Sequence, residues 1–130
     1  MRLSDAEWIV MNAVWDRPVE SSVRDVLEVV EPQTSWAYQT VQTIMVRLAQ
    51  KKALRSRLRA NTRLYTALIT REQAQRSALK SLIEKAFSGA AAPLVQALVS
   101  EEYLTAVEKR QVAETIERDL SESKEAKKKK

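Results

Sequence analysis

Apolar residues recur at helical spacing in two segments near the start of the chain. Ser4 and Glu7 have the spacing of a capping box and predict where a first helix begins, and Pro18 is expected to stop it. Ser22 and Asp25 repeat the capping pattern for a second helix, which Pro32 is expected to end. The stripes expected to be buried are Trp8, Met11, Val14 and Trp15 in the first helix, and Val23, Val26, Leu27 and Val30 in the second.

A third helix is predicted from Ser35 to Lys52, and its two faces differ in chemistry. One face carries a single apolar stripe of Ala37, Val41, Ile44, Met45 and Leu48. At about 100° per residue, the opposite face carries Gln39, Gln42, Thr43 and Val46, with Thr40 and Arg47 on its flank. This face is polar but nearly uncharged, whereas a solvated helix face normally carries charged pairs. Gln, Thr and Arg are side chains that reach base edges in the major groove of DNA.

After residue 52 the hydrophobic period changes from 3.6 to about 2, which is typical of strands. Residues 54–59 and 63–67 are predicted to form a short basic hairpin, joined by residues 60–62 with Asn61 as the residue of positive φ. Three helices followed by a hairpin make a winged helix-turn-helix, in which the third helix enters the major groove and the wing lies against the DNA backbone or an adjacent minor groove. The predicted fold class is mainly α with a small β-hairpin wing, and residues 1–69 are expected to form the DNA-binding domain.

Three further helices are predicted in residues 70–122. Thr70 with Gln73 and Thr105 with Glu108 are capping pairs, and Gly89 is expected to end the first of these helices. Because the DNA-binding domain is already complete, the apolar faces of these helices are expected to join two copies in a twofold dimer. Residues 123–130 form a lysine-rich charge run and are expected to be disordered. The residues assigned to dimerisation are Leu79, Leu82, Ile83, Phe87, Leu94, Val95, Leu98, Val112 and Ile116.

The composition argues against several classes of protein. The chain has no cysteine and no histidine, so disulfides, thiol chemistry, the usual general base and the usual metal ligand are missing. No apolar run is long enough to span a membrane, and the first residues do not form a signal peptide. We therefore expect a cytoplasmic protein that is not an enzyme, uses no cofactor or metal, and does not insert into a membrane.

Positive charge is concentrated in one block of the sequence. Residues 32–71 contain no Asp or Glu but eight Lys and Arg residues, while the rest of the chain carries a net charge of −3 within a total of +5. A segregated field of this kind is what phosphate recognition requires. We therefore predict that the chain binds double-stranded DNA. Bases are assigned to Gln39, Thr40, Gln42, Thr43 and Arg47, and phosphates to Lys51, Lys52, Arg55, Arg57, Arg59 and Arg63.

Two other interpretations stay open on this pattern. A winged-helix module can present its basic face to an acidic protein, and an architectural protein can bind DNA without sequence preference. Alternating arginines in the hairpin can also serve only to blunt an edge strand. A comparison of palindromic and random duplexes across salt concentrations separates these classes, because only a repressor prefers the palindrome.

Four segments of the chain resemble the penicillinase and methicillin-resistance repressors of bacteria, a family with copper-responsive relatives. The matching segments are LSDAEWIVMNAVW (3–15), AYQTVQTIMVRLAQKKAL (37–54), RLYTAL (63–68) and FSGAAAPLVQAL (87–98). The resemblance extends to about residue 120. It implies a winged-helix homodimer that represses transcription at a palindromic operator. It also implies the same base-reading positions in the third helix, with Trp36 and Tyr38 packing on the sugar-phosphate backbone at the helix entry.

The resemblance further implies a route of induction. In many members of the family, a membrane sensor activated by a β-lactam leads to cleavage of the repressor, so a sensor-linked protease is an implied partner and antibiotic resistance an implied setting. In the staphylococcal type the cleaved bond is Asn-Phe, and the aligned pair in this chain is Ala97-Leu98. The copper-responsive branch carries a C-terminal Cys-x-Cys pair, and the absence of cysteine excludes a copper sensor of that type.

Overall fold

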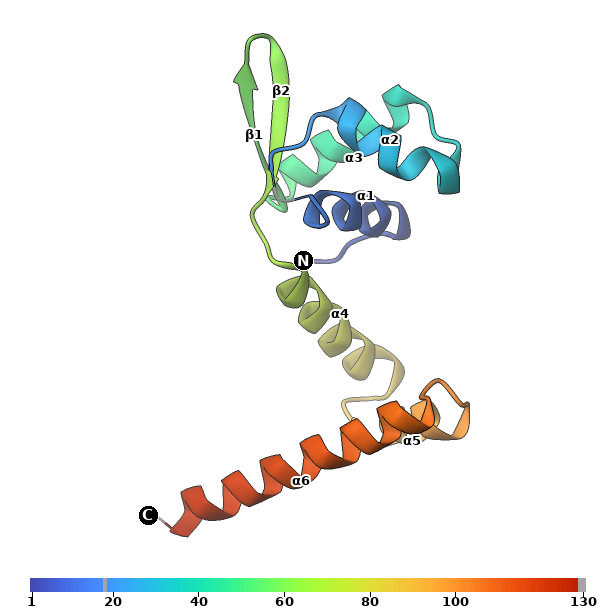
Figure 1. Ribbon diagram of the computed structural model, residues 1–130, viewed down its shortest axis with the longest axis vertical. Coiled ribbons are helices and arrows are strands. Elements are labelled where there is room, and N and C mark those ends of the chain that lie inside the picture. The colour runs from blue at the N-terminus through green and yellow to red at the C-terminus, as the bar shows by residue number, and fades with distance from the viewer. Residues whose placement is uncertain (18, 129–130) are drawn as a thin grey trace. The chain divides into compact units, whose positions relative to one another are not determined.

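The structure, a computed structural model, describes residues 1–17 and 19–128 and divides into two compact units, Met1–Ser81 and Leu82–Lys130 (Figure 1). The first unit holds helices α1 (Asp5–Trp15), α2 (Val23–Thr34) and α3 (Tyr38–Gln50) and strands β1 (Leu54–Arg59) and β2 (Thr62–Ala67). Helix α4 (Arg71–Ala86) crosses the boundary, and α5 (Ala92–Ser100) and α6 (Ala106–Lys128) follow it. The predicted fold class, mainly α with a hairpin wing, is confirmed. Pro18 of the expected first stop and the last two lysines of the tail lie outside the described residues.

The predicted helix starts are confirmed by their hydrogen bonds. The backbone N–H of Ser4 donates to Glu7 Oε1 at 2.8 Å, and the N–H of Glu7 donates to Ser4 Oγ at 3.2 Å. Ser22 and Asp25 form the same reciprocal pair at the start of α2. Each cap satisfies backbone donors that have no partner inside the helix, and such a cap is worth about 1 kcal/mol. Thr70 with Gln73 and Thr105 with Glu108 repeat this geometry before α4 and α6.

The prediction that Pro32 ends the second helix is wrong. Helix α2 continues through Pro32 to Thr34, and Ser35 caps it in the left-handed region at φ 57°. Proline removes its own N–H from the helix and crowds the carbonyl four residues earlier, and the helix extends only two residues beyond it. The Thr34 hydroxyl donates to the carbonyl of Val30 at 2.8 Å in the same turn.

The first unit is built on one apolar core. Helices α1, α2 and α3 pack together, and β1, β2 and the first half of α4 add Leu54, Tyr65 and Ala74. Trp8 and Trp15 pack at the edge of this core with their ring centroids 6.0 Å apart, and they are partly buried. Because Ala74 is buried in this unit, the division falls inside α4, after Ser81, and not at residue 69. The fully buried side chains include Val10, Met11, Val26, Val30, Val41, Met45 and Leu48.

The wing is a tight antiparallel hairpin. Strands β1 and β2 pair from Leu54 with Ala67 to Arg59 with Thr62. The loop therefore has two residues, Ala60 and Asn61, where three were expected, and both have positive φ, 49° and 67°. Two consecutive residues of positive φ match the twist of the strands in a hairpin of this length. The base of the wing is fixed by Ser21, which bridges β2 through both of its backbone hydrogen bonds to Tyr65.

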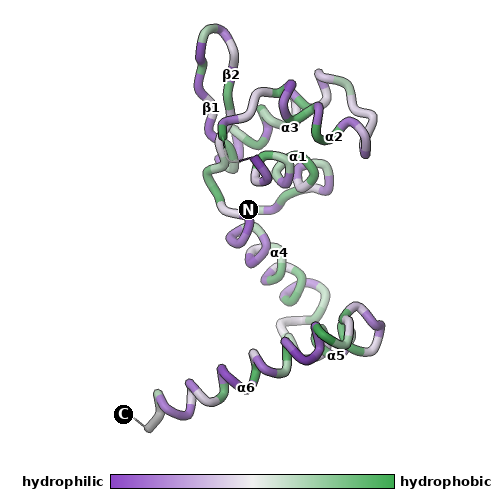
Figure 2. Tube along the Cα trace, viewed as in Figure 1, coloured by the Kyte–Doolittle hydropathy of each residue, from purple (hydrophilic) through white to green (hydrophobic). Residues whose placement is uncertain are grey.

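The second unit consists of the end of α4 with α5 and α6. No residue of α5 is buried, and the residues of α6 are exposed as far as their side chains are described. Figure 2 shows hydrophobic and hydrophilic positions alternating along α6. The expected disorder from residue 123 is not found up to Lys128, because α6 continues to that residue. Lys, Glu and Ala are strong helix formers, and cations are favourable near a helix C-terminus, which explains the extension. Over the described residues, no helix is both long and apolar enough to cross a membrane.

Candidate nucleic-acid interface

Helix α3 is shorter than the predicted range of 35–52, and Ala37 of the expected buried stripe is its exposed N-cap, but the rest of the helix separates its residues as the sequence predicts. Val41, Ile44, Met45 and Leu48 are buried and hold the helix on the core. The residues assigned to base reading, Gln39, Thr40, Gln42, Thr43 and Arg47, are all exposed on the outer side of the helix. The core packing thus presents an uncharged polar surface that ends in a single cation. That surface has the side-chain chemistry that reads base edges.

Thr43 has a defined orientation within this surface. Its hydroxyl donates to the backbone carbonyl of Gln39 at 2.9 Å, one turn earlier in the helix. A threonine hydroxyl has one donor, so this bond leaves only acceptor lone pairs and the methyl group to face outward. The methyl group is suited to apolar contact with the methyl group of thymine.

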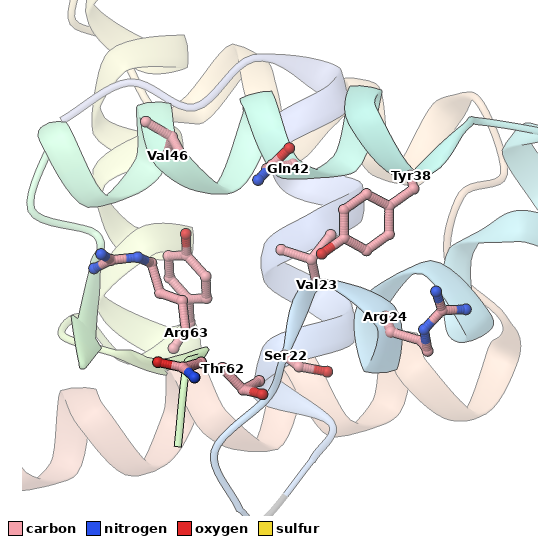
Figure 3. A pocket seen from close by; sticks show the side chains of 10 residues that line it. Ser22, Val23, Arg24, Tyr38, Gln42, Val46, Thr62 and Arg63 are labelled. Carbon is pink, nitrogen blue, oxygen red and sulfur yellow. The ribbon is translucent and has the colours of Figure 1, made fainter. Parts of the chain in front are cut away.

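An open groove of about 480 Å³ lies between α3, the start of α2 and the wing (Figure 3). Tyr38, Gln42 and Val46 follow one another along the α3 side of the groove, and Arg63 of β2 lies near its Val46 end. Arg24 of α2 lies near the Tyr38 end. Arg24 and Arg63 therefore lie at opposite ends of this groove, with Gln42 between them.

Arg24 is a member of this groove that sequence reasoning missed. It is exposed in the first turn of α2, and its guanidinium carbon lies 5.8 Å from the centre of the Tyr38 ring, within range of a cation–π contact. Its position one residue after the buried Val23 indicates that it faces outward. Because the second helix is rich in acidic residues, Arg24 did not stand out as part of a basic surface. Tyr38 is exposed as expected, whereas Trp36 is partly buried and packs against the core. The backbone contact expected for Trp36 is therefore not supported by its position.

Three cations of the acid-free block are held by acids from other parts of the first unit. Lys51 donates to Glu7 Oε1 at 2.7 Å and to the carbonyl of Arg2 at 2.9 Å. Arg57 pairs with Glu20, and Arg71 with Asp16. Lys51 and Arg57, which the sequence assigned to phosphates, therefore each have an ion-pair partner within the protein. In the part of the chain that the structure describes, no ion pair is formed by Arg47, Lys52, Arg55, Arg59 or Arg63.

The wing places its arginines on two different faces. Alternate residues of a strand point to opposite faces, so Arg55, Arg57 and Arg59 share the face away from Tyr65. Arg63 lies opposite Leu58, on the same face as Tyr65, and lines the groove beside α3. Its Nη1 donates to Ser56 Oγ at 3.0 Å. Of the wing arginines, Arg63 is therefore the one that lines the groove with Gln42 of α3.

Residues 3–118 match the family model described as penicillinase repressor. The chain belongs to the penicillinase repressor family. It is 27% identical over 103 residues to the methicillin resistance regulatory protein MecI of Staphylococcus aureus, a match that covers 79% of this chain and 83% of that protein. It is also 30% identical over 82 residues to a 16.5 kDa protein of Latilactobacillus sakei, covering 63% of this chain and just over half, 56%, of that protein.

Solved structures similar to this family member include two of the repressor BlaI. The solution structure of the BlaI DNA-binding domain is 28% identical, with a TM-score of 0.49, and the match covers 54% of this chain and 84% of that chain. The Bacillus licheniformis BlaI monomer in complex with the blaP half-operator is also 28% identical, with a TM-score of 0.48, over 55% of this chain and 87% of that one. The family to which the chain belongs is one of transcriptional repressors, and not of enzymes.

In this penicillinase repressor, the residues assigned to dimerisation have no buried position. Leu79 of the first unit and Leu82, Val95, Val112 and Ile116 of the second are exposed. Ile83, Phe87, Leu94 and Leu98 are partly buried. Apolar side chains in this state remain available for contact with another surface. The Ala97-Leu98 bond lies inside helix α5.

Proposed function

We propose that this protein is a bacterial transcriptional repressor that binds a palindromic operator as a homodimer and excludes the polymerase from the promoter. The observation that carries the proposal is the outer face of α3, where uncharged base-reading side chains are exposed next to cations that form no ion pair among the described residues. Membership of the penicillinase repressor family supports it. A repressor that binds an operator acts in the cytoplasm, where bacterial DNA lies.

Specificity in this proposal comes from α3 in the major groove. Gln39 and Gln42 can each offer a donor and an acceptor to an adenine edge, and Arg47 can bind guanine. Affinity comes from phosphate contacts, which carry no sequence information by themselves. We assign those contacts to Arg24, Lys52, Arg55, Arg59 and Arg63, with Tyr38 against the backbone.

The dimer is supported by the exposed apolar residues of α4, α5 and α6. Val112, Ile116 and Leu120 recur at intervals of four along α6, and each is exposed in the single chain. A second copy with the same stripe is the economical partner, because a twofold dimer also presents two reading helices to a palindrome. Cleavage of the aligned Ala97-Leu98 bond by a sensor-linked protease would require local unfolding, because this bond lies within helix α5.

The proposal is tested by selecting duplexes from a random-sequence DNA library with the full-length protein. A repressor should enrich a palindrome and bind it about 10³-fold or more tightly than a random duplex at physiological salt. Gln39→Ala should weaken binding to the selected palindrome by about 1–3 kcal/mol and leave binding to random DNA unchanged. Equal affinity for all duplexes would favour an architectural protein, and no retention of DNA at low salt would favour a protein-interaction module.

A pair of substitutions at Thr43 tests how this residue reads a base. Thr43→Ala should weaken binding to the selected palindrome by about 1–3 kcal/mol. Thr43→Val keeps the methyl group and removes the hydroxyl, which already bonds to Gln39. The valine variant should therefore stay within about twofold of the wild type. Gel-shift titration measures both variants, and an equal loss for valine and alanine would show that the hydroxyl is the reading group.

Arg24→Gln tests the Tyr38 end of the groove. Because a phosphate contact is indifferent to sequence, the change should weaken palindromic and random duplexes alike and reduce the slope of log affinity against log salt by about one. Arg76→Gln, at an exposed arginine of α4 outside the groove, is the matched control and should change neither quantity. Equal slopes for the wild type and Arg24→Gln would remove Arg24 from the interface.

A further inference from the structure

The middle of the wing is tied to the segment between α1 and α2 by a two-point contact. Arg57 Nε donates to Glu20 Oε2 at 2.6 Å, and Arg57 Nη2 bonds to Glu20 Oε1. This is the bidentate geometry in which a guanidinium holds a carboxylate most firmly. Glu20 lies beside the row of Arg55, Arg57 and Arg59, and it lines a small cavity of about 210 Å³ together with Arg55 and Arg57.

The contact spans the full width of the wing. Ser21 pairs with Tyr65 through N–H···O bonds of 3.0 and 2.8 Å, so the segment before α2 runs alongside β2. Glu20 precedes Ser21 and reaches past β2 to a residue of β1. A two-stranded hairpin is only marginally stable by itself and depends on such attachments. Ser21 therefore fixes the backbone of β2, and Glu20 holds the Arg57 side chain of β1.

The charges around Glu20 keep this contact formed. The hydrogen bond from Arg57 is the largest influence and lowers the pKa of Glu20, burial opposes it, and the charges of Arg57, Arg59 and Arg55 lower the pKa further. The carboxylate is therefore ionised throughout the neutral range. Three neighbouring arginines would repel one another without it, since like charges on one strand face are destabilising.

We propose that Glu20 is a positioning residue for DNA binding, which clamps Arg57 and so holds the wing in the orientation that brings Arg63 beside α3. Arg57 is an anchor of the wing and makes no phosphate contact. The clamp itself does not depend on DNA, whereas its effect on affinity rests on the proposed repressor function. The two parts are therefore measured separately.

The first measurement uses the full-length protein without DNA. Amide hydrogen exchange in residues 57–65 should be about three- to fivefold faster in Glu20→Gln and in Arg57→Gln than in the wild type. The double variant should exchange no faster than either single variant, because one contact is lost in each case. The charge-swapped variant, Glu20→Arg with Arg57→Glu, should recover most of the protection. Glu28→Gln, at an exposed acid of α2, is the matched control and should leave the wing unchanged.

The second measurement is the salt dependence of binding to the selected palindrome. Glu20→Gln and Arg57→Gln should each weaken binding by about two- to fivefold without changing the salt slope. Arg55→Gln should instead reduce the slope by about one, as expected for a phosphate contact. The charge-swapped variant should bind like the wild type.

Three results would overturn the inference. They are tighter binding by Glu20→Gln, a reduction of the salt slope by about one in Arg57→Gln, and unchanged hydrogen exchange in the wing of either single variant. The first would make Glu20 a competitor of phosphate, and the second would make Arg57 a phosphate contact. If the wild type selects no palindrome while the exchange results hold, the proposed function fails and the clamp stands.

Discussion

Lys51→Ala should destabilise the folded protein by about 2–3 kcal/mol and leave the salt slope of DNA binding unchanged. Glu7 is 1% exposed, and its carboxylate is bound by Lys51 at the end of α3 and by the Ser4 N–H at the start of α1. Removing the lysine leaves a buried charge without its cation. Breaking a fully buried ion pair costs about 3–5 kcal/mol. We expect a smaller loss of about 2–3 kcal/mol here, because the Lys51 side chain is 35% exposed and water reaches it. Urea unfolding at neutral pH measures the loss.

The same pair predicts a pH dependence. Burial is the largest influence on the pKa of Glu7 and raises it, but the hydrogen bonds from Lys51 and Ser4 together bring the pKa below its ordinary value of 4.5. A carboxyl whose pKa is lowered by folding stabilises the native state above its unfolded pKa and loses that contribution as the pH falls through its folded pKa. Without Lys51, burial still raises the pKa of Glu7 and only the hydrogen bonds from Ser4 oppose it, so the stabilising contribution of the ionised carboxylate falls. The stability gap between wild type and variant should be widest at neutral pH and narrow below about pH 4.5.

Lys52→Ala is the matched control for this experiment. Lys52 is the next residue, is exposed and forms no ion pair within the described part of the chain. Its substitution should leave stability within about 0.5 kcal/mol and reduce the salt slope by about one. If the two variants gave the same result in both measurements, the separate roles assigned to these neighbouring lysines would be wrong.

Ile116→Glu should abolish dimerisation and lower the affinity for the palindrome by about 10²–10⁴-fold. Ile116 is 50% exposed in the single chain, so a glutamate is tolerated in the fold of one copy. In a dimer interface the same carboxylate would be buried without a partner, which is strongly unfavourable. The loss of affinity follows because two linked reading helices bind one palindrome far more tightly than a single helix binds its half.

Analytical ultracentrifugation at micromolar concentration measures the effect on assembly. The wild type should sediment at about twice the chain mass of 14.8 kDa, and Ile116→Glu at the chain mass. Gln111→Glu makes the same change of charge on the opposite side of α6 and should remain a dimer. A wild-type protein that sediments as a single chain would contradict the role given to these helices. Binding of a half-palindrome by Ile116→Glu at wild-type strength would show that its reading surface is intact.

The features that the sequence predicted correctly are local. The reciprocal caps at Ser4 and Ser22 join residues three positions apart, so the local sequence is sufficient to identify them. The exposure of Gln39 and Thr43 follows from the period of α3 and from the apolar stripe opposite. The hairpin follows from a change of period, although its loop is one residue shorter than expected.

The features that the sequence did not predict depend on contacts between distant positions. Glu7 and Lys51 are 44 residues apart, and Glu20 and Arg57 are 37 apart. Counting charges along the chain assigned both cations to DNA, because the count ignores acids that approach from other elements. Arg24 was missed for the opposite reason, since it stands in an acidic stretch of sequence and joins the basic surface only in three dimensions. The end of α2 was also not predicted, because the helix continues past Pro32 to Thr34.

The division of cations between internal pairs and open surface has a physiological consequence. In the proposed function, phosphate contacts are made by five cations of each copy, Arg24, Lys52, Arg55, Arg59 and Arg63, so a dimer using all of them would make about ten. Proteins with about 6–10 phosphate contacts lose about 10³–10⁵-fold in affinity between 50 and 200 mM salt. The salt concentration inside the cell would then change the occupancy of the operator before any inducer acts.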